Sequence, residues 1–228
     1  MIDFHSHVLP GIDDGSSSVD ESLELLARSA EQGIEIVCAT SHFYPDREDP
    51  ESFLRHRERA WNLLSEKIKE DSPKVVLGAE VYYFVGISRN DMIEDLRIGD
   101  TGILLLEMPF REWSDAMVRE IAALNDRRGV RVMLAHIERY LKDQNRDVWE
   151  FLLDNGVIMQ SNADFFLDWR TKHKSHRMLK EGRVHVISSD AHNLKDRRPR
   201  IGEALEALSE RDAELLRENA YAVYGLGR

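Results

Sequence analysis

Short runs of apolar and β-branched residues alternate with longer amphipathic stretches along this chain. Most of the short runs are almost continuously apolar, which is typical of strands buried on both faces of a parallel sheet. The runs are IDFHS (2–6), EIVCATS (35–41), KVVLGAE (74–80), TGILLLEM (101–108), VRVMLAH (130–136), VIMQSN (157–162) and VHVISSD (184–190).

The stretches between the runs have the periodicity of helices. In residues 18–33, Ser18 and Glu21 have the spacing of a capping box, and Gly33 is a candidate for the residue after the helix end. Strands that alternate with helices predict parallel βα units, closed as a barrel or open as a doubly wound sheet. The other helical stretches are 50–71, 114–128, 145–155, 171–182 and 202–224.

Nearly every run ends in a side chain that can bind a metal ion. In a barrel, all strand ends meet on one face, whereas the outer strands of an open sheet are too far apart to share a site. We therefore expect an α/β fold with a seven-stranded (β/α)7 TIM-like barrel, forming one domain over residues 1–228. The side chains at these ends are His5, His7, His42, Glu80, Glu107, His136, Asn162, Asp190 and His192.

His5 and His7 stand two residues apart on a predicted strand, so both imidazoles point the same way and can reach one ion. Such a pair alone could arise by chance, but metal-binding residues at the equivalent ends of other strands argue against chance. Five histidines and four carboxylates (Asp14, Glu80, Glu107, Asp190) exceed the three protein ligands of a single catalytic zinc ion. The sequence thus predicts two or three ions. Mixed nitrogen and oxygen donors favour manganese, iron or zinc over calcium or magnesium.

The remaining histidines are interpreted as surface or packing residues, because they lie in helical stretches or within a strand. They are His56, His173, His176 and His185.

The formal net charge is −11, which disfavours broad binding to nucleic acid. A cluster of divalent ions would give an acidic protein a local site for a phosphate dianion. The start of the chain does not resemble a signal peptide, and no run is long enough to span a membrane, so we expect a cytoplasmic protein without membrane insertion.

The one cysteine, Cys38, lies inside an apolar run, where a packed and inert thiol is the expected state. Cysteine-based tyrosine phosphatases need an arginine six positions after the cysteine, but position 44 is Tyr44. Cys38 is therefore not predicted to be a nucleophile.

The motifs HSH, ATSH, Glu80, AHIERY and SSDAHN, in this order, resemble the polymerase and histidinol phosphatase (PHP) superfamily. Within it, DFHSHVLPGIDDG, LLLEMPF, AHIERY, MQSNA and SDAHN with a following Arg-Pro are most similar to the bacterial tyrosine-protein phosphatases of the CpsB/YwqE type. Those phosphatases are encoded with capsular or exopolysaccharide synthesis systems. The resemblance extends over essentially the whole chain.

The resemblance implies a distorted seven-stranded barrel with a trinuclear site, usually of manganese. His5, His7, Glu80 and Asp190 would then bind one ion. Glu80 would bridge to a second ion that Glu107 and His136 also bind, and Asp14, His42 and His192 would bind the third. Asp14 is chosen because the superfamily places the acid directly before glycine, and Asp13 is the alternative ligand.

The resemblance also implies that a hydroxide held between the ions attacks phosphorus while an arginine orients the phosphoryl group. Arg139 is the first candidate, and Arg198 is the second, although Arg198 could equally be a surface residue of the basic run KDRRPR. A phenolate leaving group, with a pKa near 10, needs less help from a general acid than an alkoxide.

The chain departs from the family pattern at three places. Ser41 and Ile137 stand where proline is usual, and residues 164–174 (DFFLDWRTKHK) replace smaller residues. None of these changes removes an expected ligand. They affect the loops around the expected site.

Three alternatives compete with a phosphatase for phosphotyrosine. The first is a small-molecule phosphatase of the same superfamily, such as one for histidinol phosphate, although those chains are usually longer. The second is an amidohydrolase, which commonly needs a lysine at a strand end, and no run here ends in lysine. The third is a non-catalytic, metal-binding regulator of a polysaccharide-export kinase. The substrate that the resemblance suggests is the tyrosine autokinase of such an export system.

Overall fold

The computed structural model describes residues 1–226, which form parallel strands surrounded by helices. One sheet has the order β1 (Ile2–Ser6), β2 (Ile36–Ala39), β4 (Lys74–Leu77). The other has the order β3 (His42–Phe43), β5 (Glu80–Tyr82), β6 (Ile103–Glu107), β7 (Arg131–Leu134), β8 (Ile158–Asn162), β9 (Val186–Ser188). Every pairing between named strands in these sheets is parallel.

The parallel α/β prediction is confirmed, but a closed barrel of seven strands is not, because the described strands form two sheets. The predicted runs 35–41 and 74–80 are each interrupted. At the first break, the register between β1 and β2 shifts: the Ser6 amide donates to the Thr40 hydroxyl (3.1 Å), and the Thr40 amide donates to the Ser6 carbonyl (2.9 Å). At the second break, a Cβ on Gly78 would lie 2.9 Å from Cγ1 and 3.2 Å from Cα of Ile98, so a larger residue would require a shift there.

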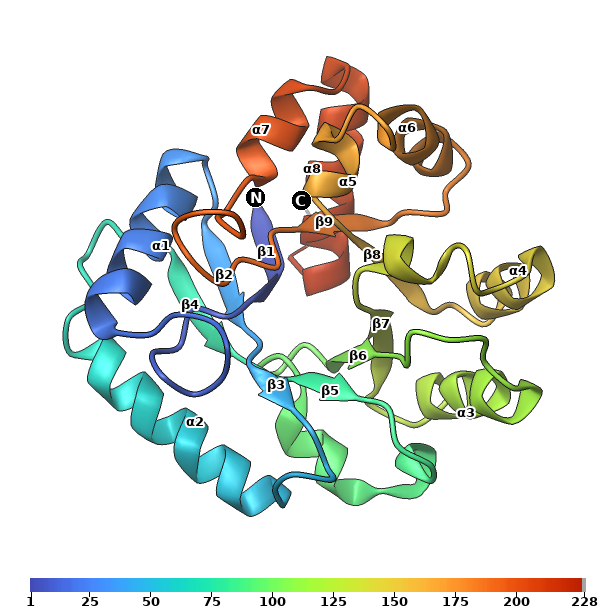
Figure 1. Cartoon of the computed structure of the whole chain (residues 1–228), viewed down its shortest axis with the longest axis horizontal. Helices are drawn as coiled ribbons and strands as arrows, with labels where there is room; N and C mark the ends of the chain where they lie inside the picture. Colours follow the sequence, from blue (N-terminus) through green and yellow to red (C-terminus); the bar gives the residue numbers. More distant parts are fainter. Residues whose placement is uncertain (227–228) are drawn as a thin grey trace.

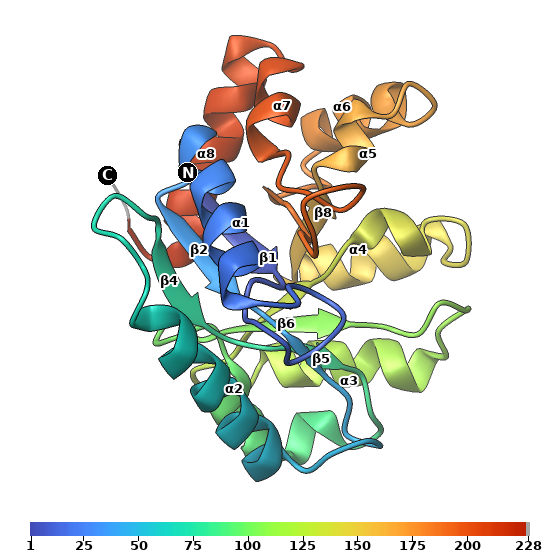
Figure 2. The same cartoon turned by 60° about the vertical axis from the view of Figure 1, so that its left-hand side comes forward.

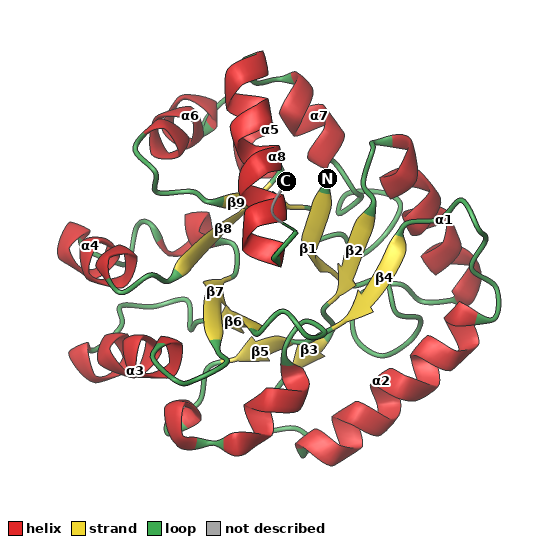
Figure 3. Cartoon of the chain, turned by 180° about the vertical axis from the view of Figure 1, so that it is seen from behind, coloured by secondary structure: helices red, strands yellow, loops and turns green. Residues whose placement is uncertain are grey.

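The two sheets adjoin at two places. On one side, the amides of Gly78 and Glu80 donate to the carbonyls of Ala39 and Ser41, each at 3.0 Å, so the hydrogen bonding of the β2–β4 pair continues into the β3–β5 pair. On the other side, the Asp190 amide donates to the His5 carbonyl (2.8 Å), next to an isolated parallel bridge between Ser6 and Ala191. The carboxyl ends of both sheets therefore converge on one region, and Figure 3 shows the strands arranged around it with the helices outside.

Helices cover the outside of the two sheets (Figures 1 and 2). The Ser18 side chain caps the first helix by accepting from the Glu21 amide (3.2 Å), as the capping box predicts, whereas the Glu21 carboxylate bonds Ser17 instead of the Ser18 amide. The α-helices are α1 (Val19–Glu31), α2 (Pro50–Ser65), α3 (Asp115–Asn125), α4 (Arg146–Asp154), α5 (Asp164–Leu167), α6 (Lys172–Lys180), α7 (Ile201–Glu206) and α8 (Glu210–Tyr224). The 3-10 helices are η1 (Ile87–Arg89), η2 (Asp91–Leu96) and η3 (Ile137–Tyr140).

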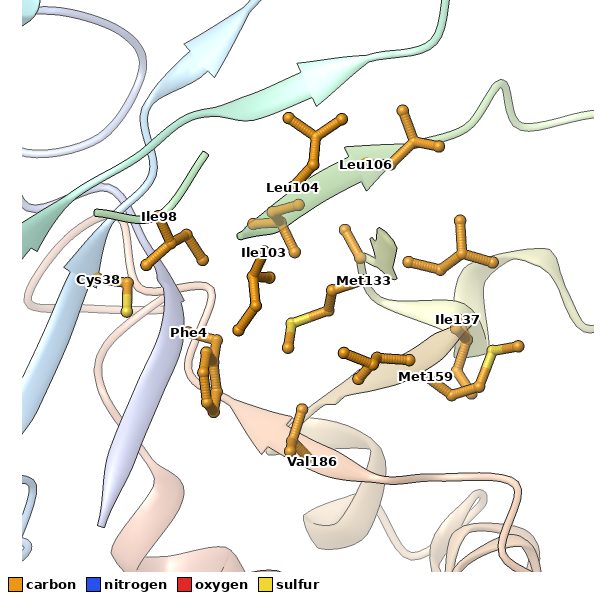
Figure 4. Close-up of a cluster of buried hydrophobic side chains, with 14 of the residues drawn as sticks. Phe4, Cys38, Ile98, Ile103, Leu104, Leu106, Met133, Ile137, Met159 and Val186 are labelled. Carbon is orange, nitrogen blue, oxygen red and sulfur yellow. The ribbon is translucent and has the colours of Figure 1, made fainter. Parts of the chain in front are cut away.

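Apolar side chains from most strands fill the space between the sheets, and Figure 4 shows several of them, including Phe4, Ile103, Met133 and Val186. Cys38 belongs to this core and is fully buried. The interpretation of a packed thiol is confirmed, and burial raises the pKa of the Cys38 thiol well above its usual value, so the thiolate is disfavoured. Among residues 1–226, no helix has both the length and the apolar character needed to cross a bilayer.

His185 lies just before β9 and supports the neighbouring strand as a neutral imidazole. Its Nδ1 accepts a hydrogen bond from the Met159 amide (2.9 Å), and burial lowers the pKa of the ring. Because the unfolded chain then binds a proton more readily than the folded chain, this residue's contribution to stability falls as the pH drops through about 6.5.

We therefore expect a His185→Gln variant to have a smaller loss of unfolding free energy than the wild type between about pH 7 and pH 5. Urea unfolding at several pH values measures this difference. Parallel curves for the two proteins would contradict the assignment of a neutral, buried imidazole.

Candidate metal centre

The structure brings all nine predicted ligand side chains together where the carboxyl ends of the strands converge. Three overlapping groups have ligand atoms close enough to share an ion: His7, Asp14, His42 and His192; His5, His7 and Asp190; and His42, Glu80 and Glu107. The ninth residue, His136, joins them through Glu80, because its Nε2 lies 3.0 Å from Glu80 Oε1. Eight of the nine lie on β1, β3, β5 and β6 or within four residues after β1, β7 and β9, and Asp14 lies on the loop after β1.

His5 and His7 face the same point, as their spacing on a strand predicts. Their Nε2 atoms are 3.2 Å apart. The Oε2 atom of Glu80 lies 3.2 Å from His5 Nε2 and 3.4 Å from His7 Nε2. The Oδ1 atom of Asp190 approaches the same two nitrogens, at 3.3 and 3.5 Å. Two histidines and two carboxylates thus surround one position.

Glu80 is the centre of the cluster. Its carboxylate is buried and also lies 2.9 Å from His42 Nδ1, so it approaches four histidines in all. Burial alone would raise the pKa of Glu80, but His5 and the contacts with His136 and His42 outweigh burial and hold it well below its usual value. Glu80 is therefore ionised and available to bridge two cations.

The two neighbouring aspartates have different positions. Asp14 Oδ1 lies 3.5 Å from His42 Nε2 and 3.4 Å from His192 Nε2, inside the first metal-binding group. Asp13 instead lies 2.8 Å from Nδ1 of His7 and accepts from the backbone amide of His42 (3.0 Å). The geometry agrees with Asp14 as the ligand and Asp13 as the residue that orients His7.

Gly15 fixes the path of this loop. A Cβ at Gly15 would lie 2.3 Å from the His7 carbonyl oxygen, so no other residue fits without a shift of the backbone.

Two of the cluster residues have left-handed backbone conformations, with φ of 32° at His136 and 51° at Asp190. Non-glycine residues rarely adopt these angles, and the surrounding structure has to hold them. The His136 amide donates to Gln160 Oε1 (2.7 Å), and the Asp190 amide donates to the His5 carbonyl.

A layer of amides behind the cluster is a feature that sequence reasoning missed. Gln160 Oε1 lies 3.3 Å from His5 Nδ1, and Gln160 Nε2 donates to Asn162 Oδ1 (3.1 Å). Asn162 in turn donates to Asp190 Oδ2 (2.8 Å). These bonds orient His5 and Asp190. The run MQSN placed Asn162 at a strand end but gave no signal for Gln160.

Two arginines reach the cluster, and one of them was not predicted. Arg139 Nη2 donates to Asp190 Oδ2 (2.6 Å), and Arg197 Nη2 donates to Asp190 Oδ1 (3.0 Å). About one third of each side chain stays exposed (37% and 34%). The other predicted arginine, Arg198, instead pairs with Glu203 beside α7. The basic run KDRRPR predicts an arginine here but does not indicate which one faces the cluster.

Aromatic rings border the cluster on two sides. The ring of Phe110 is 54% exposed, and it stacks on His136 at a centroid distance of 5.9 Å with 29° between the planes. Tyr44 lies 5.1 Å from the His42 ring and 5.6 Å from that of Tyr82. Burial and the nearby Glu107 raise the pKa of both Tyr44 and Tyr82, so both phenols stay neutral.

The cluster has the properties of a site for divalent cations. Among the described residues, buried atoms without a hydrogen-bond partner include His136 Nδ1, His192 Nε2 and Glu80 Oε2. Burial lowers the pKa of His136, but the carboxylates of Glu107 and Glu80 outweigh it and raise the pKa to about 9. Positive charge is therefore favoured at the centre, and nitrogen and oxygen donors together suit a transition metal ion.

Comparison with known proteins agrees with this geometry. Residues 1–223 match the family model described as capsular polysaccharide synthesis, CpsB/CapC. The tyrosine-protein phosphatase CpsB of Streptococcus agalactiae serotype V is 31% identical, and the alignment covers 98% of each chain. The tyrosine-protein phosphatase YwqE of Bacillus subtilis is also 31% identical, over 91% of this chain and 84% of its own.

Among solved structures, a chain from the crystal structures of YwqE from Bacillus subtilis and CpsB from Streptococcus pneumoniae, described as metal-dependent tyrosine phosphatases, superposes with a TM-score of 0.84. It shares 24% identity and covers 100% of this chain and 96% of that one, so it supports the same fold. On the family match and the relatives together, the chain belongs to the CpsB/CapC family of capsular polysaccharide synthesis.

Proposed function

We propose that this protein is a metal-dependent phosphatase for phosphotyrosine in proteins. The observation that carries the proposal is the convergence of five histidines and four carboxylates on one region of the fold. Its membership of a family whose curated relatives are tyrosine-protein phosphatases supports the same reaction. The chemistry is the hydrolysis of a phosphoric monoester.

The proposed ion sites divide the same nine side chains so that each histidine binds one ion. Glu80 joins the group of His5 and Asp190, and His136 takes the place of His42 beside Glu107. His5, His7, Glu80 and Asp190 bind one ion, Glu80 with Glu107 and His136 a second, and Asp14, His42 and His192 a third. Manganese is the favoured ion, and iron and zinc suit the same donors. Divalent ions held there supply Lewis acidity for the phosphoryl oxygens and activate water as a nucleophile near neutral pH.

The side chains around the ions hold the phosphoryl group. Arg139 and Arg197 donate to the two different oxygens of Asp190, and about one third of each side chain is exposed, so both can also donate to a phosphate oxygen. Arginine forks suit such oxygens because two parallel N–H groups can donate at once. Asp13 and Gln160 keep His7 and His5 oriented.

The exposed Phe110 ring is proposed to pack against the phenyl ring of phosphotyrosine. It stands over His136, next to the cluster, where an aryl group attached to a bound phosphate would lie. The leaving phenolate needs little protonation, so the reaction does not require a dedicated general acid.

The proposed macromolecular substrate is the tyrosine autokinase of a capsule or exopolysaccharide export system, which follows from the family alone. We further propose that the two sheets act as one distorted barrel of seven strands, in which β2 with β3 and β4 with β5 are interrupted single strands. Two sets of backbone hydrogen bonds support this interpretation: those that continue from the β2–β4 pair into the β3–β5 pair, and those between β1 and the segment after β9.

A substrate panel tests the proposal. With manganese present, we expect kcat/KM for a phosphotyrosine peptide to exceed that for a phosphoserine peptide and for histidinol phosphate by at least about a hundredfold. A Phe110→Ala variant should lose about fivefold on the phosphotyrosine peptide, because one aromatic contact is worth about 1 kcal/mol. It should lose little on the other two substrates.

Trp169→Ala serves as the control, since Trp169 is also an exposed aromatic residue (78%) but stacks on Arg170 instead of a cluster histidine. Preference for histidinol phosphate would contradict the tyrosine assignment and favour a small-molecule phosphatase.

A further inference from the structure

A cavity of about 200 Å³ lies apart from the metal centre, between η3, α4, β8 and α6. None of the nine cluster residues lines it. Figure 1 shows α4 and α6 on the same side of the molecule, outside β7 and β8. The cavity is large enough for a ring or a short acyl chain, since a cavity of about 150 Å³ accommodates benzene.

The inner surface of the cavity is apolar. Ile137, Trp149, Met159 and Met178 line it and are all at least 93% buried. Figure 4 shows Ile137 and Met159 next to each other at one side of the buried hydrophobic cluster. The two methionines have flexible, polarisable side chains that adapt to the shape of a ligand. This surface suits an apolar group and offers few hydrogen bonds to it.

The rim of the cavity is cationic, in contrast to the net charge of −11 of the whole chain. Arg146, Lys174, Arg177 and Arg183 line it, with Glu181 as the one carboxylate in the lining. Glu181 lies 3.3 Å from Arg183 and 3.9 Å from Arg177. Glu150 lies 2.5 Å from Arg146 and 3.6 Å from Arg183. Lys174 makes no ion pair within residues 1–226, so the rim retains positive charge for an anion.

One wall of the cavity is formed by η3, the 3-10 helix that contains Arg139. Ile137, in the wall of the cavity, directly follows His136, and η3 continues to Arg139 beside Asp190. Gln144, another lining residue, accepts from the Trp113 amide (3.1 Å) and donates to the Arg111 carbonyl (2.8 Å). These two hydrogen bonds hold the loop that carries Phe110 in place. A ligand in the cavity would therefore contact η3 directly and would contact Gln144, which bonds the loop that carries Phe110.

We infer that this cavity is a regulatory binding site for a small amphipathic anion. The ligand has a short acyl chain or a single ring in the apolar interior and a carboxylate or phosphate at the cationic rim. Binding fixes η3 and the loop after β6, and so changes turnover at the metal centre. The proposal that the ligand binds is independent of the proposed function, whereas the proposal that binding changes turnover rests on it.

The first test measures binding of hexanoate to the metal-free, full-length protein by the ¹H–¹⁵N resonance of the Trp149 indole, assigned with Trp149→Phe. We expect a saturable shift with a dissociation constant at or below about 1 mM, and at least tenfold weaker binding of uncharged hexanol. A Lys174→Glu/Arg177→Glu variant should lose the shift. The control Lys172→Glu/Lys180→Glu carries the same charge change on the same helix, outside the cavity lining, and should keep it.

A second variant reduces the volume of the cavity and leaves the charges of its rim unchanged. Leu153 lines the cavity and is partly buried, so Leu153→Phe should weaken hexanoate binding at least about fivefold while the net charge is unchanged. No saturable shift at about 10 mM hexanoate, or equal affinity for hexanol, would overturn the site.

The second test measures the rate of phosphotyrosine peptide hydrolysis with and without saturating hexanoate. We expect a change of at least about threefold in kcat in the wild type, and no change in the Lys174→Glu/Arg177→Glu variant. Binding at Trp149 without any change in rate would overturn the coupling to η3. Because binding is measured without substrate, failure of the phosphatase proposal would leave the first test interpretable.

Discussion

Glu80→Gln is expected to lower manganese-dependent phosphatase activity about a thousandfold, the largest effect of any single change in this protein. Glu80 approaches four histidines from a fully buried position, and an amide in its place removes the charge that binds two cations together. Lewis-acid stabilisation is worth several kcal/mol, and about 1.4 kcal/mol corresponds to each factor of ten in rate.

The measurement is kcat on a phosphotyrosine peptide together with the metal content of the purified protein. Glu120→Gln is the matched control, because Glu120 is also a carboxylate that accepts several bonds, from the Tyr83 hydroxyl (2.6 Å) and the Gly86 amide (2.8 Å), but lies outside the cluster. We expect the control to keep its metal ions and its activity within about threefold. A folded Glu80→Gln protein with full metal content and normal kcat would contradict the assignment.

Arg197→Gln is expected to lower kcat/KM about a hundredfold, whereas Arg198→Gln should change it less than about threefold. The two residues are adjacent in sequence, carry the same charge and are exposed to similar extents (34% and 37%). Only Arg197 reaches the cluster, 3.0 Å from Asp190 Oδ1, whereas Arg198 pairs with Glu203. Comparison of the two variants thus distinguishes binding of the phosphate by Arg197 from a general effect of removing one positive charge.

Steady-state kinetics on the phosphotyrosine peptide, at fixed manganese, measure both variants. Arg139→Gln should behave like Arg197→Gln, because its guanidinium donates to the other oxygen of Asp190. If Arg198→Gln caused the larger loss, the phosphate would be bound through a different arrangement of the loop after β9.

Most of the candidate site could be predicted from the sequence because its residues follow the ends of apolar runs. Strand ends in a parallel fold meet on one face, so Glu80, His136 and Asp190 come together although they are far apart in the chain. The choice of Asp14 over Asp13 needed the superfamily pattern, since two adjacent acids have the same local signal.

The features that could not be predicted depend on the fold of single loops. Which of Arg197 and Arg198 faces the cluster is set by the turn after His192, where the His192 amide donates to the Arg197 carbonyl (2.8 Å). Gln160 lies in the middle of an apolar run, where nothing in the pattern separates a residue that orients His5 from one that only packs. The breaks that divide the strands into two sheets lie at Thr40 and Gly78, where a side-chain hydrogen bond and a close contact with Ile98 leave no signal in the sequence periodicity.

The reversibility of metal dependence tests the central claim most directly. Phosphate release from a tyrosine-phosphorylated peptide is measured for the full-length protein with manganese, after removal of metal with a chelator, and after manganese is added back. We expect activity to be lost on chelation and to return with manganese as two or three ions bind. Hydrolysis that persists without metal, or a protein that binds the ions and leaves the peptide intact, would contradict a metal-dependent phosphatase for phosphotyrosine.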